Sequence, residues 1–265
     1  MNVQSLYIYP VKSLAGISVP YLELDDFGPS RDRRWMIVDE LGKFVTQRRL
    51  PRLALIKAEL NDGVVGIDIP GQGRFMLEPT SEQQRVTVWR DQVVAGVAQN
   101  LVNEALSRFC GERLRLVYMP DSTFRRVDPE RVVDVRRVGF ADGFPFLIAN
   151  TASLGELNSR LAQAVDIRRF RPNILISGAE PWDEDKWRAL TVGSVNFSVV
   201  KPCSRCVLTT VDPDTGEKDP NTEPLKTLSG YRKTEGGVIF GQNAVHESPG
   251  RIVVGDSVSI FEQEC

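Results

Sequence analysis

Short β-prone runs separated by glycine, proline and polar residues limit the fold of this chain more than any other feature. Strands that are short and closely spaced favour a β-barrel or a strongly bent sheet. We therefore expect a mainly β (α+β) protein with a β-barrel-like N-terminal part. In the first half of the chain the runs lie at residues 3–9, 16–24, 35–38, 43–47, 63–69, 74–77 and 85–88.

A helical period replaces the strand pattern in a few places. Apolar residues recur at 3.6-residue spacing over residues 91–109, and Gly111 follows as a stop signal. Ser153 and Glu156 have the spacing of a capping box at the start of a second apolar stripe. Residues 224–231 indicate a short third helix. The sequence thus predicts a few helices in an otherwise β-rich chain.

Residues 120–139 form a long basic connection between the two halves. They contain five arginines among proline and aspartate residues and show no clean periodicity. A chain of 265 residues can form one large or two small domains. We therefore predict an N-terminal domain over residues 1–119 and a second β-barrel domain with a few helices over residues 120–265.

Charge and composition argue against several classes of function. With 42% hydrophobic residues, 26% charged residues and a net charge of −2, the chain gives no general reason to bind nucleic acid or a membrane. No apolar stretch approaches the roughly 20 residues that span a bilayer. The start of the chain lacks a signal-peptide pattern. Four unevenly spaced cysteines suit a reducing compartment, so we expect a soluble cytoplasmic protein.

Cys203 and Cys206 lie between the β-prone runs 195–200 and 207–211, with Arg205 between them. In an extended chain, residues three apart point to opposite faces, so only one sulfur would face a site if the link stays extended. We interpret the pair as a site that places one thiolate on a bound ion or cofactor.

Three other interpretations of the cysteine pair remain open. A structural zinc site needs four ligands, and the chain offers besides these only Cys110, Cys265 and the single His246. A thioredoxin-like dithiol requires the pair at the start of a helix, whereas β-branched residues follow Cys206. The two cysteines could also be small, half-buried apolar side chains.

Polar residues at strand ends are further candidates for ligand binding. Lys12 and Ser13 follow the first strand and could hold a phosphate, one as a point charge and the other as a donor. Arg171 and Asn173 directly precede the buried run 174–177. The chain contains neither a Walker motif nor a Gly-x-Gly-x-x-Gly loop.

Several stretches together resemble one known family, the MOSC superfamily. The resemblance is closest to the branch of the mitochondrial amidoxime-reducing component and its bacterial relatives, in which an N-terminal β-barrel domain precedes the MOSC domain. It covers nearly the whole chain in order. The stretches are Tyr9–Ser13, Arg31–Trp35, Phe170–Asn173, Cys203–Cys206 with Thr209–Gly216, and Phe240–Gln242.

This resemblance implies a molybdenum cofactor: one pyranopterin dithiolene plus one protein thiolate on molybdenum. The thiolate corresponds to Cys206, and a soft metal does prefer thiolate sulfur. An anionic cofactor that carries phosphate needs cations and bidentate donors. By resemblance, Lys12, Ser13, Arg34 and Arg171 hold the pterin and its phosphate. The same pocket is lined by Asp142, Gly143, Phe144, Asn173, Ser204, Arg205 and Asn243.

The implied activity is the reduction of N-hydroxylated compounds (hydroxylamines, N-hydroxylated purines and amidoximes) to amines. Cys206 would tune the metal, and protons would come from water or Asp142. The sequence shows neither the membrane segment of the mitochondrial members nor the four cysteines of a [2Fe–2S] domain. We therefore expect a separate electron-donor protein of the ferredoxin or flavoprotein reductase type.

Two alternatives to the reductase stay open at this point. One is a sulfurtransferase of the molybdenum cofactor sulfurase type, in which Cys203 or Cys206 carries a persulfide. The other is a non-catalytic carrier that binds molybdopterin and hands it on.

Overall fold

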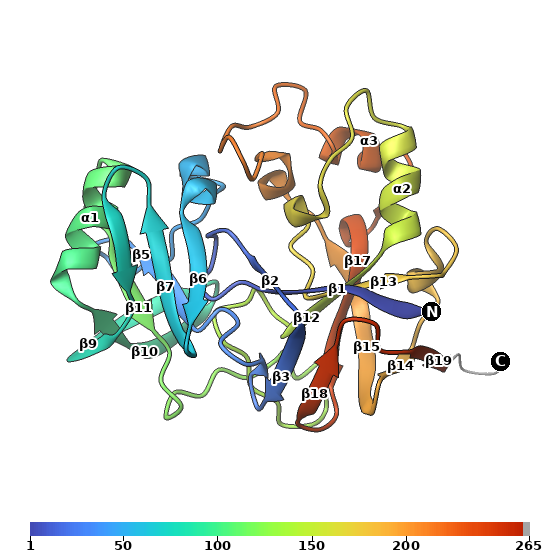
Figure 1. Ribbon diagram of the computed structural model, residues 1–265, viewed down its shortest axis with the longest axis horizontal. Coiled ribbons are helices and arrows are strands. Elements are labelled where there is room, and N and C mark those ends of the chain that lie inside the picture. Colours follow the sequence, from blue (N-terminus) through green and yellow to red (C-terminus); the bar gives the residue numbers. More distant parts are fainter. Residues whose placement is uncertain (262–265) are drawn as a thin grey trace.

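The computed structural model describes residues 1–261 and is built mainly of β-strands, with three α-helices in that range. Figure 1 shows two lobes side by side, one formed around β5–β11 and α1, the other around β12–β19 with α2 and α3. This architecture confirms the predicted mainly β class. Cys265 lies outside the described residues. None of the described helices is long and apolar enough to cross a membrane.

The largest sheet has nine strands, and its path runs β19-β14-β15-β17-β12-β13-β1-β2, with β16 paired to β17. All neighbours are antiparallel except β12 and β13. The strands are β1 (Asn2–Ile8), β2 (Ile17–Val19), β12 (Phe146–Asn150), β13 (Ile174–Ser177), β14 (Ala189–Val192), β15 (Val195–Ser204), β16 (Lys233–Thr234), β17 (Gly237–His246) and β19 (Val258–Phe261). Because β1 pairs with β13, the first residues of the chain belong to the sheet of the second lobe.

Three smaller sheets complete the fold: β5-β11-β10-β9, β6-β7-β8 and β18-β3-β4. The strands are β3 (Tyr21–Asp25), β4 (Gly28–Pro29), β5 (Trp35–Val38), β6 (Lys57–Asn61), β7 (Val64–Ile69), β8 (Gly73–Met76), β9 (Pro79–Val88), β10 (Asp91–Ala98), β11 (Arg115–Tyr118) and β18 (Gly250–Val253). The helices are α1 (Asn100–Cys110), α2 (Thr151–Ser159) and α3 (Leu225–Ser229).

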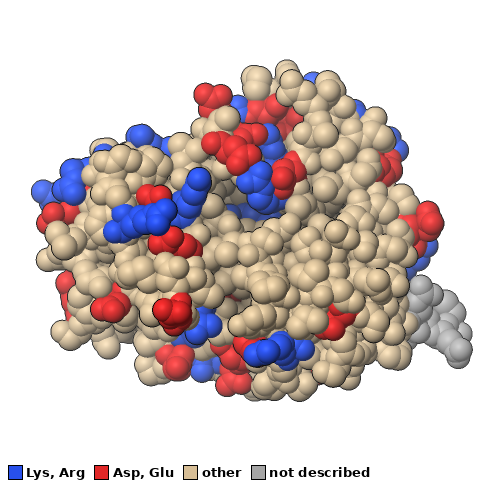
Figure 2. All heavy atoms as spheres, viewed as in Figure 1, with Lys and Arg blue, Asp and Glu red and all other residues tan. Residues whose placement is uncertain are grey.

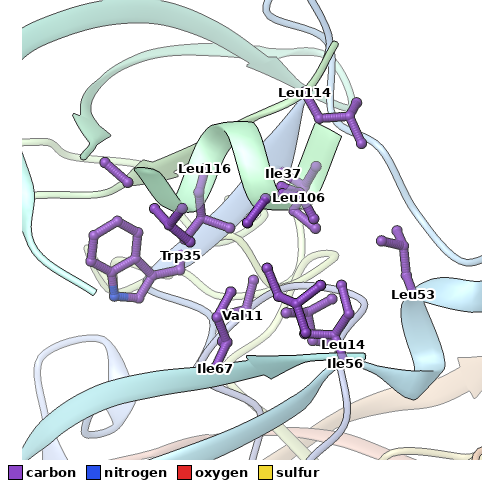
Figure 3. Close-up of a cluster of buried hydrophobic side chains, with 14 of the residues drawn as sticks. Val11, Leu14, Trp35, Ile37, Leu53, Ile56, Ile67, Leu106, Leu114 and Leu116 are labelled. Carbon is purple, nitrogen blue, oxygen red and sulfur yellow. The ribbon is translucent and has the colours of Figure 1, made fainter. Parts of the chain in front are cut away.

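Each lobe has its own apolar core. In the first lobe, α1 packs its buried face toward β11 and β7, where side chains such as Trp35, Ile67 and Leu106 converge (Figure 3). In the second lobe, Phe146 meets Phe197 edge to face, with ring centroids 5.1 Å apart. Aromatic pairs of this geometry add to the free energy gained by burying their area. The two cores leave the segments between the lobes free to form a site.

Two predicted elements take another kind of structure, and a third, the predicted strand 43–47, forms only isolated bridges, Lys43 with Thr87 and Phe44 with Val38. The predicted helix 91–109 is a strand over Asp91–Ala98 followed by α1, which begins at Asn100. The apolar residues at 93, 95 and 97 are buried and alternate with more exposed ones, because β10 pairs along its length with β9. Gly111 does end the helix as predicted, in a left-handed conformation with φ 77°.

The second difference concerns residues 207–211, which were predicted as a strand. Val207–Thr210 form a short 3₁₀ helix, η4, in which the Thr209 backbone N–H donates to the Cys206 carbonyl at 3.0 Å. β-branched side chains favour strands, but this segment has no neighbouring strand to pair with in the sheet order. The chain therefore turns directly after Cys206.

Residues 120–139 contain no helix or strand, as predicted, apart from one isolated bridge between Arg126 and Arg137. Arg125 fixes this connection from within: it pairs with Asp91 at 2.7 Å and donates to the carbonyls of Gly139 and Ala141. The proposed division at residue 119 stays a prediction. Strands β1 and β3 precede it in sequence yet pair with strands that follow it.

Ser153 does not cap α2 as the sequence suggested; the Asn150 side chain accepts from the Ala152 N–H instead. Ser153 donates to the buried Glu184 carboxylate at 2.7 Å, and Asn150 donates to the same oxygen at 3.2 Å. Burial raises the pKa of Glu184, and these hydrogen bonds only partly oppose the shift. The folded state therefore favours the protonated carboxyl.

We expect Glu184→Gln to flatten the pH dependence of stability. A carboxyl whose folded-state pKa is raised stabilises the fold below its unfolded pKa of about 4.3, and this contribution is lost as pH rises through the folded-state pKa. The glutamine variant should match wild type near pH 4 and unfold at a higher temperature at pH 7. Thermal unfolding followed by circular dichroism between pH 4 and 8 measures this. The exposed Glu217→Gln is the control; an unchanged wild-type slope in Glu184→Gln contradicts the prediction.

Candidate functional site

A cavity of about 130 Å³ lies where loops of both lobes meet. Its lining comes from residues far apart in sequence: the loop after β1, the turn before β5, the loop before β12, the segment before β13, and residues 203–206 at the end of β15. Figure 2 shows basic side chains in the hollow between the lobes, with acidic side chains beside them. The fold thus gathers charged residues from distant segments at one place.

The two cysteines both line this cavity but have different surroundings. Cys203 lies near the end of β15, and Arg205 Nη1 donates to its Sγ at 2.9 Å. Arg205 Nη2 donates to the Phe170 carbonyl at 2.6 Å, which fixes the guanidinium. Cys206 precedes η4, its side chain is exposed, and its sulfur makes no hydrogen bond within residues 1–261. Cys206 is therefore the sulfur free to bind a ligand.

Two arginines, missed by the sequence reasoning, fix the segment after Cys206. Arg169 donates to the Thr210 carbonyl at 3.0 Å and to the Asp212 carboxylate at 2.8 Å. Arg168 donates one hydrogen bond to each carboxylate oxygen of Asp214, at 3.0 and 2.8 Å. Bidentate arginine–carboxylate pairs hold geometry better than single contacts. The Asp-Pro-Asp-Thr-Gly turn thus serves as an anchor for η4 and for Cys206 before it.

Arg33 and Arg171 each place a guanidinium group over the buried Tyr9 ring, 4.4 and 4.2 Å from its centroid. Arg171 has a left-handed backbone with φ 58°, and its Nη1 donates to the Leu14 carbonyl at 2.6 Å. Its buried Nη2 has no hydrogen-bond partner within residues 1–261. Burial, together with the neighbouring charge of Arg33, lowers the pKa of Arg171 to about 10, so it remains a cation at neutral pH.

Asp32 supplies a negative charge close to the guanidinium groups of Arg33 and Arg171. It is buried, pairs with Arg33 at 2.5 Å, and accepts hydrogen bonds from the Tyr9 backbone N–H and from Asn173 Nδ2. Burial raises the pKa of Asp32, against the effect of Arg33. One carboxylate cannot neutralise two guanidinium groups, so this part of the cavity keeps an excess of positive charge.

Lys12 and Asp142 form an ion pair at the other end of the cavity. The Lys12 ammonium is buried and also donates to the Phe140 carbonyl at 2.8 Å. Burial lowers the pKa of Lys12, while the contact with Asp142 opposes this. The Asp142 side chain is 68% exposed, and Trp89 Nε1 donates to it at 3.2 Å. Phe140 and Asp142 use two of the three N–H donors of the Lys12 ammonium, and among residues 1–261 the third has no hydrogen-bond partner and can contact a bound anion.

Arg34 does not lie in the cavity, contrary to its assignment from the sequence. Its guanidinium donates to the Met119 carbonyl and to Asp121, and stacks on Phe27 at 3.8 Å. Arg33 ends the turn before β5 in a left-handed conformation with φ 45°, and its side chain, rather than that of Arg34, lines the cavity. The other predicted site residues line it: Lys12, Ser13, Asp142, Gly143, Phe144, Arg171, Asn173, Ser204, Arg205, Cys206 and Asn243.

The side chains present fit the kind of cofactor that the resemblance implies. A free thiol lies in the same cavity as cations from three segments, and two buried guanidinium nitrogens, Arg171 Nη2 and Arg205 Nε, have no partner within residues 1–261. Buried donors of this kind are normally hydrogen-bonded. The volume is below the roughly 300–1,000 Å³ of most small-molecule sites. A larger ligand must therefore extend beyond this cavity.

Comparisons with known proteins agree with this picture. Residues 1–113 match the model of the MOSC N-terminal beta barrel domain, and residues 135–259 match that of the MOSC domain. Human mitochondrial amidoxime-reducing component 1 is 36% identical over 292 residues, which cover 99% of this chain and 83% of that protein. Rat mitochondrial amidoxime reducing component 2 is 33% identical over 289 residues (97% and 82%). Molybdenum cofactor sulfurase of Solanum lycopersicum is 30% identical over 285 residues, covering 96% of this chain but 35% of that protein.

Proposed function

The chain belongs to the MOSC-domain family, on the branch of the amidoxime-reducing components, and we propose that it is a molybdenum-cofactor-dependent reductase of N-hydroxylated compounds. Its substrates are hydroxylamines, hydroxylaminopurines and amidoximes, which it converts to amines. One observation carries the proposal: the unpartnered thiol of Cys206 shares a cavity with Lys12, Arg33 and Arg171. This pairing of a soft metal ligand with cations suits an anionic, phosphate-bearing metal cofactor.

Each group of side chains has a separate task. Cys206 ligates the metal, and Arg33, Arg171 and Lys12 hold the pterin and its phosphate. Arg205 binds Cys203 and the Phe170 carbonyl, and so sets the shape of the link before Cys206. When bound, the cofactor supplies the two-electron redox chemistry that cleavage of an N–O bond requires.

Overall, the N-hydroxylated substrate takes up two electrons and two protons and leaves as amine and water. The contacts with the Lys12 ammonium and the Trp89 N–H hold the pKa of the largely exposed Asp142 carboxyl well below its usual range. The carboxylate is therefore ionised at neutral pH and accepts hydrogen bonds. We propose that protons come from water and that Asp142 positions Lys12. The electrons come from a separate donor protein.

Reduction of benzamidoxime with a chemical electron donor, together with elemental analysis, tests the proposal. We expect molybdenum near one atom per chain and benzamidine as the product. Bound molybdenum without turnover would instead indicate a carrier of the cofactor. Labile sulfane sulfur without molybdenum would indicate sulfur transfer.

A further inference from the structure

A second cavity, of about 610 Å³, adjoins the first. The two share one wall, Asp142, Gly143 and Phe144. The rest of the second cavity is lined by residues 89–93 at the β9–β10 hairpin, by residues of the 124–129 segment, and by Lys201 of β15. Its volume lies within the usual range of small-molecule sites. None of the residues proposed to hold the cofactor (Lys12, Arg33, Arg171 and Cys206) belongs to its lining.

Trp89 stands at the boundary of the two cavities in an unfavourable backbone conformation. It lies in the two-residue turn between β9 and β10 with φ 55°, where hairpins prefer asparagine, aspartate or glycine. Strain of this kind persists where surrounding contacts hold it and is concentrated at functional sites. Trp89 is also 42% exposed, whereas Trp35 and Trp187 are 3% and 2% exposed. A large apolar ring is thus held in solvent at some cost to stability.

Three neighbours hold the Trp89 ring in place. Its Nε1 donates to Asp142, its ring lies 5.1 Å from that of Phe44, and the Arg48 guanidinium lies 4.6 Å from its centroid. These contacts restrain the indole beside the shared wall while part of its surface stays open. A restrained, open aromatic face is suited to stacking on a planar ligand.

The second cavity also carries unpaired positive charge. Arg90, Arg126 and Lys201 line it, and none forms an ion pair with a carboxylate among the residues that the structure describes. Of the acidic residues in its lining besides Asp142, Asp91 pairs with Arg125 and Asp128 accepts from the Glu130 backbone N–H. Lys201 Nζ lies 5.6 Å from the centroid of Phe144, in the shared wall. The cavity therefore favours an aromatic ligand with a negative group.

We propose that this second cavity binds the organic part of the substrate, and that the preferred substrates are planar aromatic N-hydroxylated compounds carrying a carboxylate or phosphate. The ring stacks on Trp89, the anionic group faces Lys201 and Arg126, and the N–O group points past Asp142–Phe144 toward Cys206. This inference rests on the proposed function and names its substrate class.

Steady-state kinetics of the holoenzyme with benzamidoxime and 4-carboxybenzamidoxime test it. In Trp89→Ala, kcat/KM should fall about tenfold for both substrates, mainly through KM, because ring stacking is lost. Trp89→Phe keeps a ring but loses the N–H that binds Asp142, and should recover most of the loss. Lys201→Ala should raise KM for the carboxylated substrate alone, by about tenfold. The exposed Lys226→Ala on α3 is the matched control.

Hydroxylaminopurine riboside and its 5′-monophosphate form a second pair, which separates recognition of phosphate from that of carboxylate. Molybdenum content and melting temperature are measured for every variant, so that cofactor loss or misfolding is not mistaken for lost substrate binding. Calorimetric binding of the product 4-carboxybenzamidine gives a readout without turnover and should weaken in Trp89→Ala. Unchanged KM values and product affinity in a molybdenum-loaded Trp89→Ala would overturn the inference. A loaded wild type that reduces neither substrate would overturn the proposed function instead.

Discussion

Replacing Cys206 with serine is expected to release molybdenum and to lower N-reduction to less than about 1% of the wild-type rate, because a serine hydroxyl is a hard ligand that stays protonated at neutral pH. Cys203→Ser is expected to keep both metal and activity. The two variants make the same chemical change within the same motif. They differ in surroundings, since Arg205 donates a hydrogen bond to the sulfur of Cys203, whereas the sulfur of Cys206 has no hydrogen bond within residues 1–261.

Elemental analysis, pterin content and turnover of benzamidoxime together measure this difference. Cys110→Ser serves as a third variant that keeps both motif cysteines. Cys110 is buried in the core of the first lobe, and burial raises its pKa to about 11, so it is not a thiolate at neutral pH. Equal molybdenum content in Cys206→Ser and Cys203→Ser would contradict the assignment of Cys206 as the metal ligand.

Local sequence signals predicted the β-rich class and several element ends, but not the period of every segment. Short apolar runs bounded by turn residues were sufficient to predict strands such as β13. Gly111 was sufficient to predict where α1 ends. The helix prediction was wrong over residues 91–98, because the β-branched and small apolar residues of this strand happen to match the spacing of a helix. The β9–β10 pairing that decides their conformation involves a partner strand, which periodicity within one segment does not reveal.

Most of the residues that the resemblance assigned to the site line one cavity, because the motif residues follow one another in short local segments. Arg34 does not line it, since the turn at Arg33, with φ 45°, places the Arg33 side chain there instead. Tyr9 and Asp32 were missed for another reason. Their roles arise when the loop after β1 and the turn before β5 meet the segment before β13, more than 130 residues away. No local pattern encodes that contact.

We expect Arg171→Gln to weaken cofactor binding while leaving the metal-free protein as stable as wild type or more stable. At neutral pH Arg171 is a cation beside Arg33, with one buried donor unpaired within residues 1–261. Because its folded-state pKa is lowered, charging this group destabilises the fold at every pH below about 10, and glutamine removes that cost. Natural functional sites often trade stability for binding in this way.

Loss of a charge-assisted hydrogen bond corresponds to about 10- to 100-fold weaker binding. Molybdenum and pterin retained after dialysis, at low and high salt, measure the first half of this prediction, and calorimetric melting of the metal-free protein measures the second. Arg34→Gln is the matched control with the opposite pattern: it breaks buried contacts to the Met119 carbonyl and should lower the melting temperature, yet retain the cofactor. The opposite pattern would contradict the assignment: an Arg171→Gln variant that melts lower and keeps its cofactor, together with an Arg34→Gln variant that loses it. Arg34 rather than Arg171 would then hold the phosphate.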